Sequence, residues 1–259
     1  MRLLNHIQNM RELHNFVRSI SDQIRNNEID IGRHHYALPL LHGVLQAIHC
    51  DYDKLVAVEL GVAWGNGLFD LCKAAEFFRK QFEIDIQVYG FDNATGLPPI
   101  TDYRDHPELW YPGDYKMPDA AEIISKLPDF AHLIIGDVQE TIPELEESMY
   151  GYRLGFVAVD VDYYSSTLAA FKMLEFSPHY YVPAVPMYFD DIEGAITYNP
   201  WSGEEGAAND FNKTHELRKI QRRTNYPIHH FHVCHILDHP IRTGKLRPRF
   251  PLQIFPGTI

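Results

Sequence analysis

The sequence predicts an α/β fold in which a mostly parallel sheet of seven strands carries helices on both faces. Short apolar runs alternate five times with segments whose apolar residues repeat at helical spacing. This alternation is typical of parallel strands joined by right-handed helical crossovers. The 259 residues are 45% hydrophobic and 22% charged, so the chain can bury a sizeable core. No linker or internal repeat interrupts it, and we expect a single domain of residues 1–259.

Two helices are expected before the first strand. Apolar residues from Leu13 to Ile24 repeat at helical spacing, which predicts an amphipathic helix. A second helix is expected at residues 35–50. Residues 1–53 then form an N-terminal helical extension, and residues 54–259 form the core with the sheet.

The elements of the core follow in order. Strands are expected at residues 55–60, 86–91, 132–135, 154–159, 184–189, 228–237 and 252–255. Helices are expected at residues 68–78, 141–149, 168–174 and 206–223. The connection 93–118 is rich in proline and acidic residues. It is longer than usual, which indicates a lid or a binding loop.

The charge balance excludes some classes of partner. The formal charge of −12 argues against nucleic-acid binding, which needs a basic face, and against docking on anionic lipid. Cys50, Cys72 and Cys234 are too few and too widely spaced for a disulfide framework or a Cys-rich zinc site. No signal peptide and no run of about 20 apolar residues is recognisable. We therefore expect a cytoplasmic protein with no nucleic-acid or membrane partner.

Acidic residues follow five of the predicted strands. A single acid in this position often only caps the next helix. Ligands of open α/β sheets, however, bind outside the carboxyl ends of the strands, so five such endings favour a shared crevice. The acids are Glu59, Asp92, Asp137, Asp160 and the pair Asp190-Asp191.

The first of these turns, VELGVAWGNG, predicts a cofactor site. Gly61, Gly65 and Gly67 allow a sharp turn and the close approach of a ligand. The turn is not the GxGxxG fingerprint of dinucleotide sites, and Glu59 would repel a pyrophosphate but suits an ammonium group. Asp92 ends the second strand, where a carboxylate accepts hydrogen bonds from ribose hydroxyls. Together these features favour S-adenosylmethionine as the cofactor.

Four further carboxylates predict a metal site. Asp160 and Asp162 follow the fourth strand, and Asp190 and Asp191 follow the fifth. Their mutual repulsion would be relieved by a divalent cation, and all-oxygen ligands favour a hard ion such as Mg²⁺. The alternative is two solvated pairs of acids.

Six segments resemble the macrocin/mycinamicin-type sugar O-methyltransferases, a branch of the class I S-adenosylmethionine-dependent enzymes. The resemblance implies a Rossmann-like class I methyltransferase fold and methyl transfer to a hydroxyl of a sugar or a glycosylated natural product. The segments lie between residues 58 and 211 and are, in family order, VELGVAWGNG, YGFDNATGLPPITD, IIGDVQETIPEL, VDVDYYSSTLAAF, YFDDIEGA and the weaker GEEGAANDF.

The resemblance also implies roles for individual cofactor-binding residues. Glu59 and Gly61 would line the methionine part of the cofactor, and Gly65 and Gly67 would close that turn. Asp92 would hold the ribose hydroxyls.

For the remaining acids, the resemblance implies one residue near the adenine and three that bind the metal. Asp137 would lie near the adenine. Asp160 or Asp162, together with Asp190 and Asp191, would hold Mg²⁺. The ion would bind the acceptor hydroxyl and lower its pKa, as a Lewis acid does.

Two candidates remain for the general base that the hydroxyl needs. One is Asp162, if Asp160 alone serves the metal, and the other is His215 in the helix after the paired acids. The family usually carries Pro-Gly-Gly before the fifth strand and an aromatic residue where this chain has Ile192. These departures leave the acceptor open, because that region shapes its pocket.

Several aromatic residues and the histidines each have two possible roles. Trp64 packs over the cofactor or belongs to the core. Trp110, Tyr111 and Tyr115 stack on a sugar or make a subunit contact. A half-exposed strand explains the His-rich segment better than a zinc site does; its histidines are His229, His230, His232, His235 and His239.

The sequence thus predicts a Mg²⁺- and S-adenosylmethionine-dependent O-methyltransferase with a small-molecule hydroxyl acceptor. The alternative is a non-catalytic S-adenosylmethionine-binding partner protein, and a nicotinamide dehydrogenase is a weaker third reading. A homo-oligomer assembled through the N-terminal helices is also expected.

Overall fold

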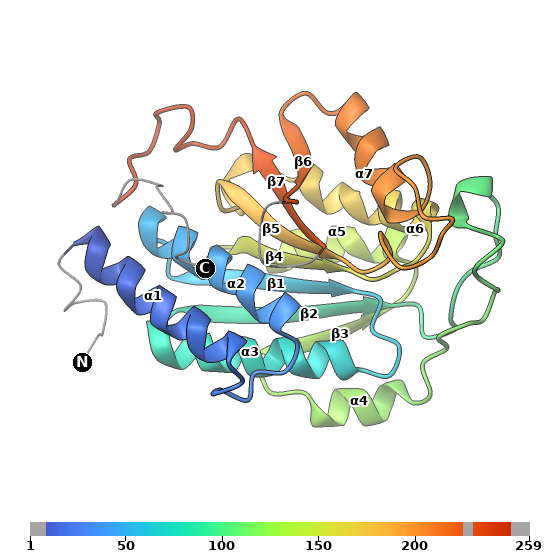
Figure 1. Cartoon of the computed structure of the whole chain (residues 1–259), viewed down its shortest axis with the longest axis horizontal. Helices are drawn as coiled ribbons and strands as arrows, with labels where there is room; N and C mark the ends of the chain where they lie inside the picture. Colours follow the sequence, from blue (N-terminus) through green and yellow to red (C-terminus); the bar gives the residue numbers. More distant parts are fainter. Residues whose placement is uncertain (1–8, 225–229, 250–259) are drawn as a thin grey trace.

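The computed structural model describes residues 9–224 and 230–249, and Figure 1 shows a twisted sheet between layers of helices. The sheet has seven strands in the order β3-β2-β1-β4-β5-β7-β6. The pairs among β1 to β5 are parallel, whereas β7 runs antiparallel to β5 and to β6. The predicted mostly parallel sheet of seven strands is therefore confirmed. Its strands are β1 (Lys54–Leu60), β2 (Asp85–Asp92), β3 (Ala131–Ile135), β4 (Arg153–Val159), β5 (Ala184–Phe189), β6 (Arg218–Arg222) and β7 (Phe231–Ile236).

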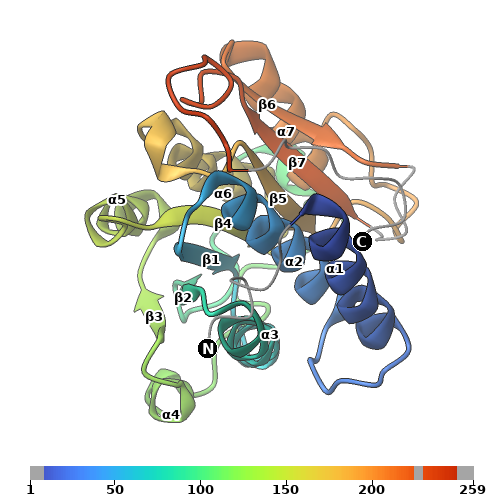
Figure 2. The ribbon, with the colours of Figure 1, turned by 90° about the vertical axis from the view of Figure 1, so that its left-hand side faces the viewer.

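Helices cover both faces of the sheet. In Figure 2, α1, α2 and α3 lie on one side of the sheet and α5 and α6 on the other. The seventh helix packs against α6 and β6. The helices are α1 (Met10–Arg25), α2 (His34–Cys50), α3 (Asn66–Phe82), α4 (Ala120–Lys126), α5 (Val138–Ser148), α6 (Tyr164–Ala170) and α7 (Gly203–Thr214). Short 3-10 turns are η2 (Tyr103–Asp105), η3 (Phe171–Glu175) and η4 (Pro178–Tyr180).

The predicted helix 206–223 is wrong in its second half. Helix α7 ends at Thr214, and the chain then turns back to form the edge strand β6. The side chain of Asn212 bonds both backbone groups of Ile220, at 2.7 Å each. Pairing with β7 therefore overrides the helical pattern of the sequence. That pattern extends to Arg223 because the residues of the strand are polar and do not interrupt it. The expected strand 228–237 is β7, and the expected strand 252–255 lies outside the described residues.

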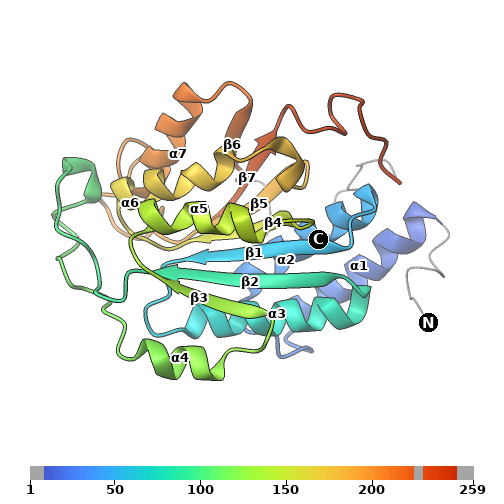
Figure 3. The ribbon, with the colours of Figure 1, turned by 180° about the vertical axis from the view of Figure 1, so that it is seen from behind.

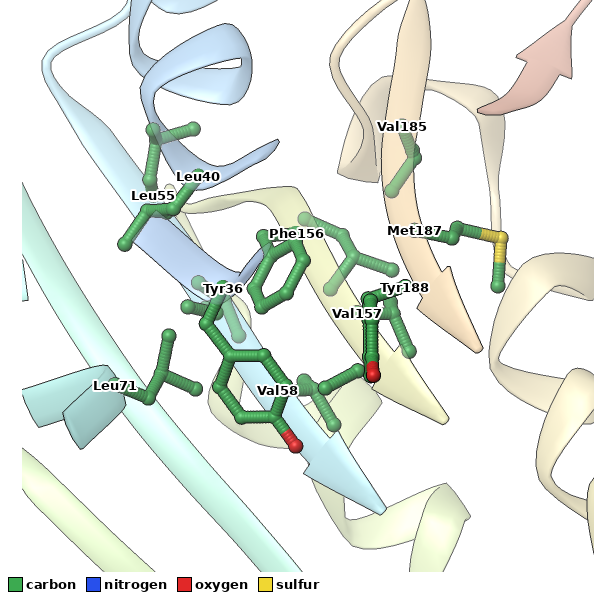
Figure 4. Close-up of a cluster of buried hydrophobic side chains, with 14 of the residues drawn as sticks. Tyr36, Leu40, Leu55, Val58, Leu71, Phe156, Val157, Val185, Met187 and Tyr188 are labelled. Carbon is green, nitrogen blue, oxygen red and sulfur yellow. The ribbon is translucent and has the colours of Figure 1, made fainter. Parts of the chain in front are cut away.

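The core lies where α2 crosses the centre of the sheet. Figure 4 shows side chains of α2, β1, β4 and β5 meeting around Phe156. Helix α2 approaches β4 at two glycines, because a Cβ on Gly43 would lie 2.0 Å from the carbonyl oxygen of Gly155. Nearly all of α2 is buried, so the N-terminal helices are part of the packed structure. In the described part of the chain, no helix combines the length and the apolar character needed to cross a bilayer.

The parallel strands all point toward one end of the molecule. The long segment between β2 and α4 projects beyond that end, as Figure 3 shows. The turns that follow β1, β2, β4 and β5 are therefore neighbours, although they come from distant parts of the sequence. The candidate site lies among these turns.

Candidate functional site

A cavity of about 310 Å³ opens at the carboxyl ends of the parallel strands. Most of the residues predicted to belong to the site line it. The exceptions are Gly65, predicted for the cofactor turn, and His215, predicted as a candidate base. The predicted residues in its wall are Glu59, Gly61, Gly67, Asp92, Asp137, Asp160, Asp162, Asp190 and Asp191.

The turn after β1 is held in place by Asp92. Its Oδ2 atom accepts hydrogen bonds from the amides of Val62 and Ala63, at 2.8 and 2.9 Å, and its Oδ1 accepts one from Ala94 at 2.6 Å. Gly61 has a φ of 82°, and a Cβ there would lie 1.7 Å from the carbonyl oxygen of Asp160. Only glycine fits this position. Asp92 therefore shapes the turn after β1 as well as lining the cavity.

Glu59 is a buried carboxylate whose second oxygen has no partner. The hydroxyl of Tyr36 donates to Oε1 at 3.0 Å, while Oε2 is buried without a described hydrogen bond. A Cβ on Gly67 would lie 1.9 Å from Oε1, so this glycine makes room for the acid. Burial and the charge of Asp160 raise the pKa of Glu59 well above its usual range. An orphaned oxygen in a cavity wall is suited to a cationic or N–H-bearing ligand.

Arg33, which the sequence analysis missed, stands beside Glu59. It occupies the N-cap position of α2, where its side chain makes no capping hydrogen bond, and it lines the cavity. Its Nη1 donates to the hydroxyl of Tyr36 at 3.2 Å and lies 3.9 Å from Oδ2 of Asp160. No residue pattern singles it out in the sequence, because α2 comes before the first strand and its packing could not be read from spacing.

Three aspartates form the candidate metal site. Asp160, Asp190 and Asp191 each offer an oxygen, and these atoms all lie within 4.8 Å of one another. Burial and the charges of the two neighbours raise the pKa of Asp160 to about 8. An all-oxygen set of this kind fits a hard divalent cation, which would offset the repulsion.

Asp162 stands apart from this triad. Its carboxyl group is hydrogen-bonded to Asp191, and burial together with the charge of Asp191 raises its pKa to about 9. Its φ of 59° is a left-handed conformation, which is uncommon for a residue with a side chain and is concentrated at functional sites. The geometry therefore groups Asp160, rather than Asp162, with the paired acids.

Neighbouring side chains hold the aspartates in place. The hydroxyl of Tyr188 donates to Asp190 at 2.6 Å, and that of Tyr198 donates to Asp191 at 2.7 Å. Glu204, fully buried in the first turn of α7, accepts from the amides of Val161 at 3.2 Å and Asp191 at 3.1 Å. It thereby ties together the turns after β4 and β5. The weak GEEGAANDF segment was the only signal in the sequence for this acid.

Aromatic residues border the mouth of the cavity. The rings of Trp64 and Tyr115 meet edge to face at 5.9 Å, and Tyr115 meets Trp110 at the same distance. Trp64 is 53% exposed, so the expectation of a core role does not hold. Tyr111 is 69% exposed and is not in the wall. The cavity thus has exposed aromatic rings in addition to the candidate metal site.

The long segment that carries these rings is anchored at its base. Asp105 is fully buried and accepts the amide of Ser165 at 2.8 Å. Arg104 bonds Asp210 of α7 at 3.0 Å and the hydroxyl of Tyr164 at 2.7 Å. These contacts fix η2 against α6 and α7.

Asp137 and His215 have structural partners. The side chain of Asp137 caps α5, accepting the amide of Gln139 at 2.8 Å, and it also lines the cavity. His215 stacks on Phe211 and lies 3.3 Å from Glu175. It follows the last turn of α7, about 16 Å from the end that carries Glu204. The structure therefore does not bring His215 to the site.

The histidines of the His-rich segment do not gather around a common point. His229 lies outside the described residues. The others face separate groups, and the acidic triad is the only metal-binding arrangement found in the described parts of the chain. The separate partners are Glu193 for His230, Glu205 for His232, Gln221 for His235 and the carbonyl of Tyr181 for His239.

Comparison with known proteins identifies the fold. No protein-family model and no curated protein sequence matches the chain. Among solved structures, it is similar to the calicheamicin methyltransferase CalS11, with a TM-score of 0.51 and 18% identity over 78% of both chains. It is also similar to the O-methyltransferase NovP, with a TM-score of 0.50 and 16% identity over 78% of this chain and 77% of that one. The chain has the fold of these methyltransferases, which confirms the predicted Rossmann-like class I architecture.

Proposed function

We propose that this protein is an S-adenosylmethionine-dependent and Mg²⁺-dependent O-methyltransferase whose acceptor is a hydroxyl of a sugar or a glycosylated natural product. One observation carries the proposal: a single cavity joins the orphaned carboxylate of Glu59 to an all-oxygen triad of aspartates. The fold shared with CalS11 and NovP supports it.

The cofactor half of the cavity has the donors and acceptors that the proposal needs. Glu59 offers Oε2 to the ammonium group of the methionine part. Backbone amides take both lone pairs of Oδ2 of Asp92 and one lone pair of Oδ1, so Oδ1 can still accept a ribose hydroxyl. Gly136 and Asp137 form the wall farther along, where the adenine would lie.

The acceptor half contains the acids and the exposed rings. In this proposal Asp160, Asp190 and Asp191 hold the cation, which supplies Lewis acidity toward the acceptor hydroxyl. Asp162 is next to the triad and outside it, so it remains the candidate base. Trp64 and Tyr115 offer faces on which a sugar ring can stack, and positioning of the acceptor contributes much of the rate enhancement.

Calorimetric titration tests the cofactor and the metal separately. We expect the protein to bind S-adenosylhomocysteine in the micromolar range, and to bind Mg²⁺ in a manner that does not require that ligand. Turnover of a panel of glycosylated hydroxyl acceptors should depend on Mg²⁺ and stop with a chelator.

Two outcomes would count against the proposal in different ways. The absence of cofactor binding at millimolar concentration would overturn the enzyme assignment and the fold-based reading of the cavity. Tight binding without turnover of any hydroxyl acceptor would favour the non-catalytic partner protein instead.

A further inference from the structure

We infer that Arg33, from the segment between α1 and α2, binds the carboxylate at the amino-acid end of the cofactor. The inference rests on the proposed function and deepens it, because it assigns to the N-terminal extension a direct role in cofactor recognition.

A guanidinium and a carboxyl group stand side by side in the cavity wall. The guanidinium of Arg33 donates to the hydroxyl of Tyr36, and the same hydroxyl donates to Glu59. Nη1 of Arg33 is also 3.1 Å from the point where a Cβ on Gly67 would stand. Because Tyr36 is fully buried and packs against Phe156 and Tyr188 (Figure 4), its ring holds the two groups in a fixed relation.

This donor and this acceptor match the two polar groups of an α-amino acid. The ammonium group needs an acceptor, which the orphaned Oε2 of Glu59 provides. The carboxylate needs donors, and the planar guanidinium can offer two parallel N–H groups to it. Arg33 is the only Lys or Arg among the residues that line the cavity in the described part of the chain.

The guanidinium has donors left for such a ligand. Its only hydrogen-bond acceptor among the described residues is Tyr36, and an arginine carries five N–H groups. The contact with Asp160, at 3.9 Å, is an ion pair beyond hydrogen-bond distance, and about a third of each side chain is exposed. Solvent therefore screens this pair. A structural counter-ion for Asp160 and Glu59 is the competing role for Arg33, and the experiment must separate the two.

Two ligands that differ only in the carboxylate provide that separation. S-adenosylmethionine and its decarboxylated form share the adenosine, the sulfonium and the ammonium. We expect the unmodified protein to bind the first about 10- to 100-fold more tightly in calorimetry, which is the usual range for a charged hydrogen-bonded contact.

The substitution Arg33→Gln should abolish this preference. It should weaken binding of S-adenosylmethionine about 10- to 100-fold and leave the decarboxylated ligand within about threefold. Arg33→Lys keeps the charge without the planar fork and should recover part of the preference. The matched control is Arg18→Gln on the exposed face of α1, which should change neither affinity, and thermal unfolding shows whether each variant folds.

Three other results would overturn either the inference about Arg33 or the proposed function. If Arg33→Gln weakens both ligands equally, Arg33 acts as a counter-ion for the acids and the inference is overturned. If the unmodified protein binds both ligands alike, no residue recognises the carboxylate and the inference is again overturned, while cofactor binding stands. If it binds neither ligand, the proposed function itself fails.

Discussion

At the scale of single residues, the site is defined by like charges kept close together. Asp160, Asp190 and Asp191 bring their oxygens within 4.8 Å of one another, and such an arrangement costs free energy unless protons or a cation neutralise it. Neighbouring tyrosine hydroxyls orient two of the carboxylates, and a buried glutamate holds the backbone of the turns that carry them. These contacts lead to two predictions about individual side chains.

The first prediction concerns Asp191. Replacement by Asn removes one charge from the triad and should weaken Mg²⁺ binding at least about tenfold in calorimetry. Mg²⁺-dependent turnover should be lost, while the affinity for S-adenosylhomocysteine stays within about twofold. Asp22→Asn, an equal change of charge on the exposed face of α1, is the control. Unchanged turnover in Asp191→Asn would remove Asp191 from the metal site.

The second prediction concerns the hydroxyl of Tyr198, which orients Asp191 at 2.7 Å. Tyr198→Phe should weaken Mg²⁺ binding by about tenfold, because groups that orient metal ligands usually contribute that much. Tyr150→Phe, at a tyrosine that is 88% exposed, should leave Mg²⁺ affinity unchanged. An equal effect of the two substitutions would show that the contact with Asp191 does not matter.

The acids could be predicted from the sequence, because a carboxylate that ends a parallel strand is placed by the strand itself. Residues that reach the site from other elements could not. Arg33 precedes the first strand in the sequence, and Tyr198 and Glu204 follow the fifth. Their contribution depends on how α2 and α7 pack, which short-range spacing does not encode.

At the scale of elements, α2 can lie close to the sheet because two glycines face each other where they meet. Gly43 in the helix faces the carbonyl of Gly155 in β4. Because Arg33 precedes α2 directly and Tyr36 lies in its first turn, the helix connects this packing contact with the wall of the cavity.

A third prediction follows from that contact. Gly→Ala inside a helix ordinarily stabilises a protein by about 0.5–1 kcal/mol. Gly43→Ala would instead place a methyl group 2.0 Å from the oxygen of Gly155, so we expect a loss of about 1–3 kcal/mol. Urea unfolding measures the difference, and a stabilised variant would show that α2 can move away freely.

The edge strand β6 shows where prediction of elements fails. Residues 206–223 have a continuous amphipathic pattern, yet Arg218–Arg222 form a strand that pairs with β7. A short polar edge strand has no strong pattern of its own. The strands β1, β4 and β5, by contrast, were predictable because they are continuous apolar runs that are buried along nearly their whole length.

At the scale of the whole molecule, the acids link stability to pH. The pKa values of Asp160 and Asp162 are raised to about 8 and about 9, whereas in an unfolded chain they are about 3.9. Near pH 7 the folded protein therefore holds protons that the unfolded chain has released. Stability must then fall as the pH rises through the folded pKa values.

The fourth prediction is that, with a chelator present, stability falls by roughly 1–2 kcal/mol between about pH 7 and pH 9. The buried His42, with a pKa lowered to about 3, is neutral in both states over this window and does not contribute. Mg²⁺ should reverse the trend, because it binds the deprotonated acids.

Thermal unfolding at three pH values, with chelator and with Mg²⁺, checks this prediction. Asp160→Asn should flatten the pH dependence in the chelator series. A chelator-treated protein that gained stability as the pH rose would contradict the raised pKa values.

The order of the strands also determines the order in which the site can be assembled during synthesis. The strands β3, β2 and β1 are neighbours in the sheet, and all three have left the ribosome once Ile135 has emerged. That half already contains Glu59 and Asp92. The mutually repelling aspartates belong to β4 and β5 and arrive afterwards. A nascent chain can therefore form the wall that carries Glu59 and Asp92 before the cluster of aspartates exists, so a neutralising cation could act only on the last stage of folding.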